Sequence, residues 1–156
     1  MDSFSSLAPR RSGAGDALGA GGLGGGTSSV MPLRVFLVED SPSVRDRLID
    51  FLAEPGKVDV IGFADTETEA VRQLWAEPFD VAIVDLNLRE GTGMGVIESL
   101  RALQSVPRPT VVVLTNYAFP EFEVACRERG ADYFFDKSTQ FGALKVLLQS
   151  IQRKRN

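Results

Sequence analysis

The feature that most constrains the fold of this 156-residue chain is a regular alternation of short apolar runs with stretches of helical periodicity, which starts at Leu33. The runs are rich in Val, Ile and Phe and are mostly apolar on both faces of a strand. Such strands belong to a parallel sheet that is covered by helices on each side. The runs lie at 33–38, 58–64, 79–86, 110–115 and 132–135.

Between these runs, apolar residues recur at spacings of three and four, which is typical of helices with one buried face. The pattern predicts a helix that starts at Pro42, a shorter helix over 120–129, and a last helix capped by Ser138 or Thr139. Trp75 and the phenylalanines are interpreted as core residues. The order (βα)₅ predicts one doubly wound α/β domain with a parallel five-stranded sheet.

The first 30 residues differ from the rest because they are rich in Gly, Ser and Ala. A segment of that composition has too little apolar surface to offset its ordering entropy. We therefore expect residues 1–30 to be a flexible tail and residues 31–156 to form the domain.

Composition excludes several classes of function. The sequence has no histidine, so neither a Ser–His nor a Cys–His nucleophile pair can form within it. Cys126 is the one cysteine and cannot make an internal disulfide, which favours a cytoplasmic location. The net charge of −4 argues against direct nucleic-acid binding, and no apolar run approaches the roughly 18 residues of a membrane span.

Charged and polar residues gather where the predicted strands end. Sites in open parallel sheets form beyond the carboxyl ends of the strands, so residues from separate runs would share one rim. The residues at these ends are Glu39 and Asp40, Asp85, Thr115, and Asp136 with Lys137.

Each of these residues also has a purely structural interpretation. Asp40 or Ser41 could cap the helix that starts at Pro42, and Asp85 could form a turn through its own side chain. Thr115 could end a strand because of its β-propensity, and Lys137 could be solvated. As a set they indicate more, because carboxylates brought close together need a cation, and a hard ion such as Mg²⁺ binds oxygen ligands.

On these residues, the region from Leu33 to Ile151 resembles the receiver domain of two-component response regulators. The spacings from Asp40 to Asp85, to Thr115 and to Lys137 are 45, 30 and 22 residues, which are typical of that family. The resemblance implies the flavodoxin-like receiver fold with strand order 2-1-3-4-5.

The resemblance also implies roles for the site residues. Asp85 would accept a phosphoryl group from a phosphohistidine on a sensor histidine kinase or a histidine phosphotransfer protein, which gives an aspartyl phosphate. Lys137 would contact a phosphoryl oxygen. Mg²⁺ would be held by Asp40, Asp85 and the backbone carbonyl of Asn87, with Glu39 reaching it directly or through water.

Two further residues would carry the response. The Thr115 hydroxyl would swing to the new phosphoryl group, and Phe134 would then turn from exposed to buried. Tyr133, the neighbour of Phe134, is an alternative for that role, and Phe134 can also be read as plain core.

The sequence departs from the family pattern at three places. Ser138 follows Lys137 where the family usually has Pro, which leaves the geometry at Lys137 open. Arg89 stands where Pro is common after the third strand. Asn116 follows Thr115 where a smaller residue is frequent, and we hypothesise that it slows loss of the phosphoryl group.

Only five residues follow Ile151, so we expect a stand-alone receiver that signals by contact with other proteins. We do not expect an enzyme, although the domain would assist its own phosphorylation and dephosphorylation. The expected partner surface covers roughly 118–125, 132–135 and 141–152, where a downstream protein binds or a homodimer forms. The alternatives are a receiver-like module that works without phosphorylation, an aspartate-nucleophile phosphatase, and a flavin binder. Asn87 in place of an Asp argues against the phosphatase, and the acidic loop after Val38 argues against the flavin binder.

Overall fold

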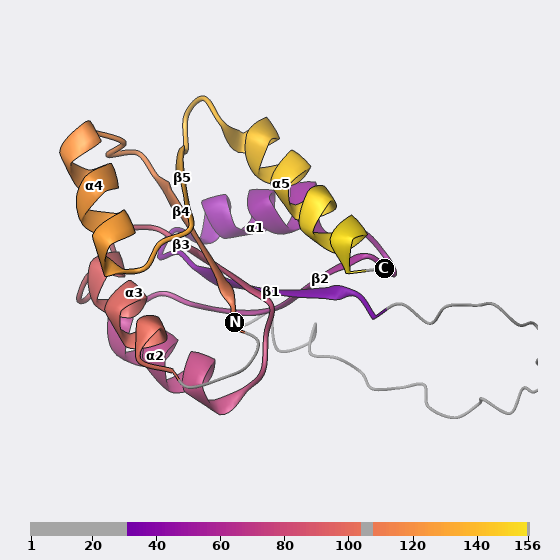
Figure 1. The fold of residues 1–156 in the computed structure, drawn as a ribbon, viewed down its shortest axis with the longest axis horizontal. Coiled ribbons are helices and arrows are strands. Elements are labelled where there is room, and N and C mark those ends of the chain that lie inside the picture. Colours follow the sequence, from indigo (N-terminus) through magenta and orange to yellow (C-terminus); the bar gives the residue numbers. More distant parts are fainter. Residues whose placement is uncertain (1–30, 104–107, 156) are drawn as a thin grey trace, which may run out of the picture.

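The computed structural model describes residues 31–103 and 108–155, so the expected tail of residues 1–30 lies outside the described residues. Strands and helices alternate through the whole described part, as the sequence pattern predicts (Figure 1). The elements are β1 Leu33–Val38, α1 Pro42–Leu52, β2 Val58–Ala64, α2 Glu67–Ala76, β3 Val81–Val84, α3 Gly93–Arg101, β4 Thr110–Thr115, α4 Pro120–Arg129, β5 Tyr133–Asp136 and α5 Phe141–Lys154.

The strands form one parallel sheet in the order β2-β1-β3-β4-β5, which confirms the predicted fold. The chain winds outward from β1 in one direction through β2 and in the other through β3 to β5. The connections that follow β1 and β3 therefore leave these two paired strands in opposite directions, and in this class of sheet ligands bind beyond the carboxyl ends at that switch point.

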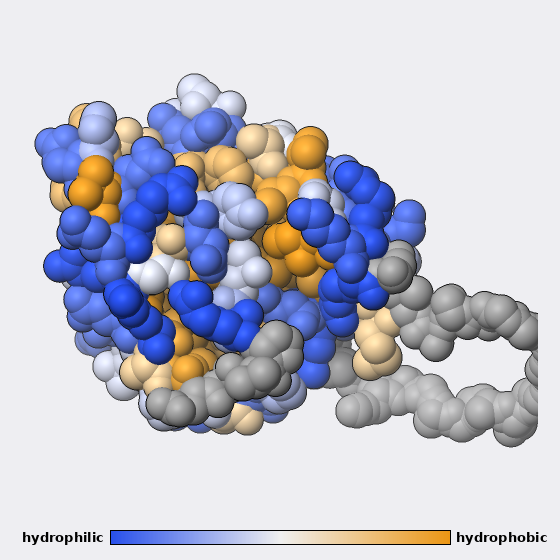
Figure 2. Space-filling model, in the orientation of Figure 1, coloured by the Kyte–Doolittle hydropathy of each residue, from blue (hydrophilic) through white to orange (hydrophobic). Residues whose placement is uncertain are grey.

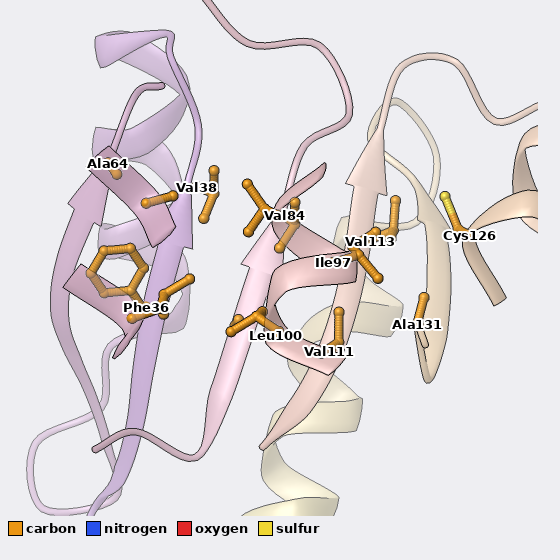
Figure 3. Packing of buried hydrophobic residues seen from close by; sticks show 14 residues of the cluster. Phe36, Val38, Ala64, Val84, Ile97, Leu100, Val111, Val113, Cys126 and Ala131 are labelled. Carbon is orange, nitrogen blue, oxygen red and sulfur yellow. The ribbon is translucent and has the colours of Figure 1, made fainter. Parts of the chain in front are cut away.

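Two apolar clusters lie on the two faces of the sheet. Alternate residues of β1 point to opposite sides, with Phe36 and Val38 in one cluster and Val35 and Leu37 in the other. Helices α2, α3 and α4 cover the first face, and α1 and α5 cover the second (Figure 1). Figure 3 shows the first cluster, where β-strand valines such as Val84 face Ile97 and Leu100 of α3.

Side-chain caps start three of the helices. The Ser41 hydroxyl accepts a hydrogen bond from the Val44 amide at 3.3 Å, ahead of a proline in the first turn of α1. Thr66 and Thr92 cap α2 and α3 in the same way, each at 3.1 Å. These caps fix where each helix begins after its strand-end loop.

The predicted cap of α5 is wrong. The residue before α5 is Gln140, and no side chain caps this helix. Ser138 instead turns back to Asp136, whose Oδ1 accepts hydrogen bonds from the Ser138 amide at 2.8 Å and hydroxyl at 2.7 Å. A carboxylate two residues away competes successfully for the serine, so the loop after β5 forms a turn before the helix starts.

Some residues interpreted as core are exposed. The Trp75 side chain is 52% exposed, and its indole Nε1 donates to Ser99 Oγ at 3.1 Å. Its neighbour Leu74 takes the buried place, because adjacent residues of a helix point about 100° apart and the buried face of α2 is narrow. Phe119 and Phe122 are also exposed, and they pack on each other with ring centroids 5.9 Å apart.

No helix within residues 31–103 or 108–155 combines the length and the apolar character needed to cross a bilayer.

Candidate functional site

The carboxyl ends of β1, β3 and β5 bring Glu39, Asp85 and Lys137 together. The Lys137 ammonium lies 2.8 Å from Glu39 Oε1 and 2.7 Å from Asp85 Oδ2. Both carboxylate side chains are almost fully buried, and the Lys137 side chain is 10% exposed. Residues 98 and 52 positions apart in the chain thus form one buried charged group.

Asp40 completes an acidic cluster with Glu39 and Asp85. Each of the three residues offers a carboxylate oxygen within 4.8 Å of the others. Asp40 is only partly buried, so the cluster opens to solvent on its side. Three carboxylates against one ammonium leave an excess of negative charge at this edge of the sheet.

The backbone explains why these residues lie level with one another. The sheet register pairs Val38 with Val84, so the strands end side by side. The next residues continue the ladder, because the Asp85 amide donates to the Val38 carbonyl at 2.9 Å and the Glu39 amide to the Ala64 carbonyl at 3.0 Å. The clustered side chains therefore extend from the sheet backbone at the carboxyl ends of the strands.

Burial and neighbouring charges shift two pKa values in the cluster. Burial raises the pKa of the Glu39 carboxyl, and the neighbouring Asp85 adds to this rise, while the Lys137 ammonium offsets only part of it. Burial opposes the charged form of Lys137, but its hydrogen bonds to Asp85 and Glu39 outweigh burial and raise its pKa. The hydrogen bonds of Lys137 therefore favour its ammonium form, whereas burial disfavours the charged form of Glu39.

Thr115 and Asn87 flank this cluster. The Thr115 side chain is fully buried, and its hydroxyl accepts a hydrogen bond from the Tyr117 amide at 3.0 Å. Within the described part of the chain, no hydrogen bond joins that hydroxyl to Asp85. Thr115 is linked to the site through its carbonyl, which accepts from the Lys137 amide at 2.8 Å. Asn87 is exposed, and its backbone N–H donates to Asp85 Oδ1 at 3.5 Å.

The two aromatic candidates on β5 differ in burial. Phe134 is half-buried and packs against the cluster that contains Val113 and Cys126. Tyr133 is more exposed and stacks on Phe135 with an interplanar angle of 9°. Phe134 thus already contacts the core on the α4 side, whereas Tyr133 lies on the other face of the strand.

Comparison with known proteins decides the family. The family model of the response regulator receiver domain matches residues 35–149 of this chain. The chain belongs to the response regulator receiver family. Its receiver domain is 35% identical over 89 residues to the DNA-binding transcriptional activator DevR/DosR of Mycobacterium tuberculosis, a match that covers 57% of this chain and 40% of that protein.

Other relatives extend the match along the receiver domain. The response regulator protein PilR of Pseudomonas aeruginosa is 27% identical over 123 residues, covering 79% of this chain and 27% of PilR. The chain spans between about a quarter and a half of the length of such curated relatives. The activities of these relatives therefore belong to longer proteins.

Solved structures share the receiver fold. The signal receiver domain of the putative response regulator NarL from Mycobacterium tuberculosis has a TM-score of 0.70 at 22% identity, covering 79% of this chain and 98% of that one. A response regulator from Burkholderia pseudomallei with a phosphorylated aspartic acid, a calcium ion and citrate has a TM-score of 0.65 at 26% identity, covering 78% and 69%.

The donor set of the receiver domain fits a hard divalent cation. All three clustered side chains offer carboxylate oxygens, which are the ligands that Mg²⁺ prefers. The raised pKa of Glu39 points the same way, because a buried carboxylate with incomplete compensation gains from a further cation. Partial exposure of Asp40 leaves room for the waters that Mg²⁺ keeps.

Two residues that support the receiver site were missed by sequence reasoning. A Cβ at Gly93 would lie 2.1 Å from the Asp85 carbonyl oxygen, so only glycine lets the start of α3 approach the strand end. Arg45 donates from Nη1 to the Glu39 carbonyl at 2.9 Å, and its guanidinium lies 3.9 Å from the centre of the Phe63 ring. The glycine-rich sequence 91–95 was a signal for the first, whereas nothing in the helical pattern distinguishes Arg45.

Proposed function

We propose that this receiver domain accepts a phosphoryl group on Asp85. The observation that carries the proposal is the Asp85 carboxylate, held 2.7 Å from the Lys137 ammonium and within one acidic cluster with Glu39 and Asp40. Membership of the receiver family supports the same function. The donor would be a phosphohistidine on a histidine kinase or a histidine phosphotransfer protein, since this chain contains no histidine.

The transfer follows from the geometry of the acceptor. One carboxylate oxygen of Asp85 attacks phosphorus and forms an acyl phosphate, while the bond from phosphorus to the imidazole nitrogen breaks and its electron pair returns to the ring. Lys137 already bridges Asp85 and Glu39, so its ammonium is placed to hydrogen-bond a phosphoryl oxygen in place of a carboxylate. Such transfer depends mostly on positioning and on stabilising charge.

Mg²⁺ would be held by Glu39, Asp40, Asp85 and the backbone carbonyl of Asn87. When bound, the ion offsets negative charge on the transferring phosphoryl group. Glu39 and Asp85 contribute to this site because Lys137 can leave them for the phosphoryl oxygens. Asp40 contributes because it is the member of the cluster that solvent reaches.

Thr115 and Phe134 would convert phosphorylation into a change of surface. The Thr115 hydroxyl would exchange its contact with the Tyr117 amide for a phosphoryl oxygen, which draws the loop after β4 toward Asp85. Phe134 lies on the neighbouring strand and would move further into the space that this shift opens beside the core. Through both steps, the new phosphoryl group would favour one of two arrangements of β4 and β5 over the other.

The surface of α4, β5 and α5 would then contact a downstream protein or a second copy of the chain. Large apolar side chains are exposed there, namely Phe122, Val124, Tyr133 and Val146. Figure 2 shows apolar atoms over α4 and α5 between hydrophilic ones. An apolar surface with a polar surround is typical of protein contacts.

Incubation with Mg²⁺ and acetyl phosphate tests the proposal by intact mass and by mapping of the modified residue. Wild type should gain one phosphoryl group on Asp85, and Asp85→Ala should gain none. Asp59→Asn is the matched control, since Asp59 is exposed on the edge strand β2, and it should behave as wild type. Equal modification of wild type and Asp85→Ala would exclude Asp85 as the acceptor. An unmodified wild type would instead favour a receiver-like module that works without phosphorylation.

A further inference from the structure

Arg89 places a cation on the rim of the acidic site. It lies in the loop between β3 and α3, four residues after Asp85, and its side chain is 60% exposed. Its guanidinium Nη2 lies 3.2 Å from Oδ1 of Asp65, which directly follows β2. The ion pair therefore connects the loop that follows β2 with the loop that follows β3 and carries the proposed phosphoacceptor.

The backbone that carries Arg89 is held by contacts that do not involve its side chain. The Glu67 amide donates to the Glu90 carbonyl at 3.0 Å, and Glu67 Oε1 accepts from the Thr92 amide at 2.9 Å. Gly91 adopts a φ of 77°, and a Cβ there would lie 2.4 Å from the Glu67 Cβ. The loop is thus fixed by α2, so the guanidinium can leave Asp65 without loss of the loop conformation.

The ion pair with Asp65 is weak enough to exchange. Exposed pairs of this kind are worth about 0–1 kcal/mol, because water and salt screen both charges. A guanidinium also binds phosphoryl oxygens through two parallel N–H bonds, which an exposed single-bonded pair with Asp65 does not match. A phosphoryl group that reaches the rim therefore competes well for Arg89.

The position of Arg89 distinguishes it from the other cations around the site. Lys137 hydrogen-bonds Glu39 and Asp85 inside the cluster, so it would contact the phosphoryl group only after the donor has arrived. Arg45 is turned toward the Glu39 carbonyl and lies over Phe63. Arg89 differs from Lys137 and Arg45 because its partner, Asp65, lies on the rim of the site. Asp65 directly follows Ala64, whose carbonyl accepts from the Glu39 amide at 3.0 Å, so the Arg89–Asp65 pair lies next to the acidic strand end.

We propose that Arg89 recruits the phosphodonor: Asp65 holds the guanidinium at rest, and the phosphoryl oxygens of an arriving donor replace Asp65. The inference rests on the proposed function of Asp85. It identifies the favoured class of small donor as doubly charged acyl phosphates, because the contribution of the guanidinium grows with the charge on the phosphoryl group. The same contact would orient a partner's phosphohistidine.

Initial rates of Asp85 phosphorylation by acetyl phosphate, at low ionic strength, test the inference. Arg89→Ala should lower the rate about tenfold, in the range of electrostatic steering, and added salt should reduce the difference. Phosphoramidate carries less charge on its phosphoryl group and should show a smaller difference. Arg72→Ala is the matched control, since Arg72 is an exposed, ion-paired arginine of α2, and its rate should equal that of wild type.

Asp65→Asn separates release of Arg89 from a general change of charge. It should raise the rate with acetyl phosphate, and this gain should disappear in the double variant Asp65→Asn/Arg89→Ala, because the gain acts through the guanidinium. An equal gain from Asp65→Asn in wild type and in Arg89→Ala would overturn the inference. A lower rate of the single variant Asp65→Asn than of wild type would also overturn it.

The outcomes also separate this inference from the proposed function. Wild type that is phosphorylated on Asp85 at the same rate as Arg89→Ala leaves the proposed function in place and overturns the role of Arg89. A loss of rate in Arg89→Ala that is equal for both donors and independent of salt also overturns it, since the effect would then be structural. If wild type accepts no phosphoryl group, the inference fails together with the proposed function.

Discussion

The Lys137 ammonium lies 2.7 Å from Oδ2 of Asp85 and 2.8 Å from Oε1 of Glu39, and one cation thus compensates two buried carboxylates. In water each of these ion pairs would contribute little, but in a site where all three side chains are nearly buried, the loss of the cation leaves two charges without a partner. Lys137 is therefore important for the stability of the resting fold as well as for the proposed chemistry.

Lys137→Met should destabilise the fold by about 3 kcal/mol at neutral pH, near the lower end for breaking a buried pair, because Glu39 can take up a proton in response. Urea unfolding measures the change. Lys57→Met is the control, since Lys57 is exposed, and it should stay within about 0.5 kcal/mol of wild type. A Lys137→Met variant as stable as wild type would show that the carboxylates do not depend on this ammonium.

The fold was predictable because its signals are local and repeated. The apolar runs at 33–38, 58–64 and 110–115 coincide with β1, β2 and β4, since β-branched residues bounded by polar loops leave little ambiguity. The run 79–86 shortens to Val81–Val84, because the register with β1 and β4 covers only those four residues. The meeting of the strand-end residues follows from parallel order alone.

The errors have a common physical cause, which is competition between contacts that one-dimensional patterns do not contain. Ser138 has the chemistry of a helix cap, yet its amide and hydroxyl donate to the Asp136 carboxylate instead. Trp75 has the size of a core residue, yet Leu74 occupies the buried face and leaves the indole to Ser99. The support of the Asp85 backbone by Gly93 likewise depends on a close approach that only three dimensions reveal.

The raised pKa of Glu39 predicts a specific pH dependence of stability. The folded state binds this proton more tightly than the unfolded chain, whose value is near 4.5. The proton on Glu39 therefore makes its full contribution to the free energy of unfolding below about pH 4.5. This contribution is lost as the pH rises through the pKa that Glu39 has in the folded state. Glu39→Gln keeps a hydrogen-bond acceptor for Lys137 without the charge.

The free energy of unfolding of Glu39→Gln should thus exceed that of wild type at neutral pH, and the gap should close as the pH falls toward 4.5. Urea unfolding across that range gives the difference. Comparison with Glu121→Gln, an exposed glutamate of α4, removes effects of net charge. A gap that widens toward acidic pH would mean that the pKa of Glu39 is lowered.

Mg²⁺ should stabilise the receiver domain through the acidic cluster. Binding to the folded state alone contributes about 2.7 kcal/mol at a concentration one hundred times the dissociation constant. Asp40→Asn removes a charged ligand from the accessible side of the cluster and should abolish most of the shift in melting temperature that Mg²⁺ produces. Asp46→Asn, which changes an exposed acid of α1, should retain the full shift. Equal Mg²⁺ shifts in both variants would place the ion outside the cluster.

The close packing of Gly93 on the end of β3 gives a test of the backbone geometry around Asp85. A Cβ at Gly93 would lie 2.1 Å from the Asp85 carbonyl oxygen and 2.8 Å from the Leu86 Cα, and backbone atoms cannot yield as a flexible side chain does. Gly93→Ala should destabilise the fold by about 1–3 kcal/mol and slow phosphorylation of Asp85, because α3 must move away from the strand end.

Gly142 provides the matched control for that substitution. It also lies near the start of a helix, but a Cβ there would meet no atom within 4 Å. Gly142→Ala should therefore stabilise the fold by about 0.5–1 kcal/mol, since alanine restricts the unfolded chain and favours the helix. Thermal and urea unfolding of the two variants should move in opposite directions from wild type. If Gly93→Ala instead matched Gly142→Ala, α3 would not be packed against Asp85 as closely as the structure has it.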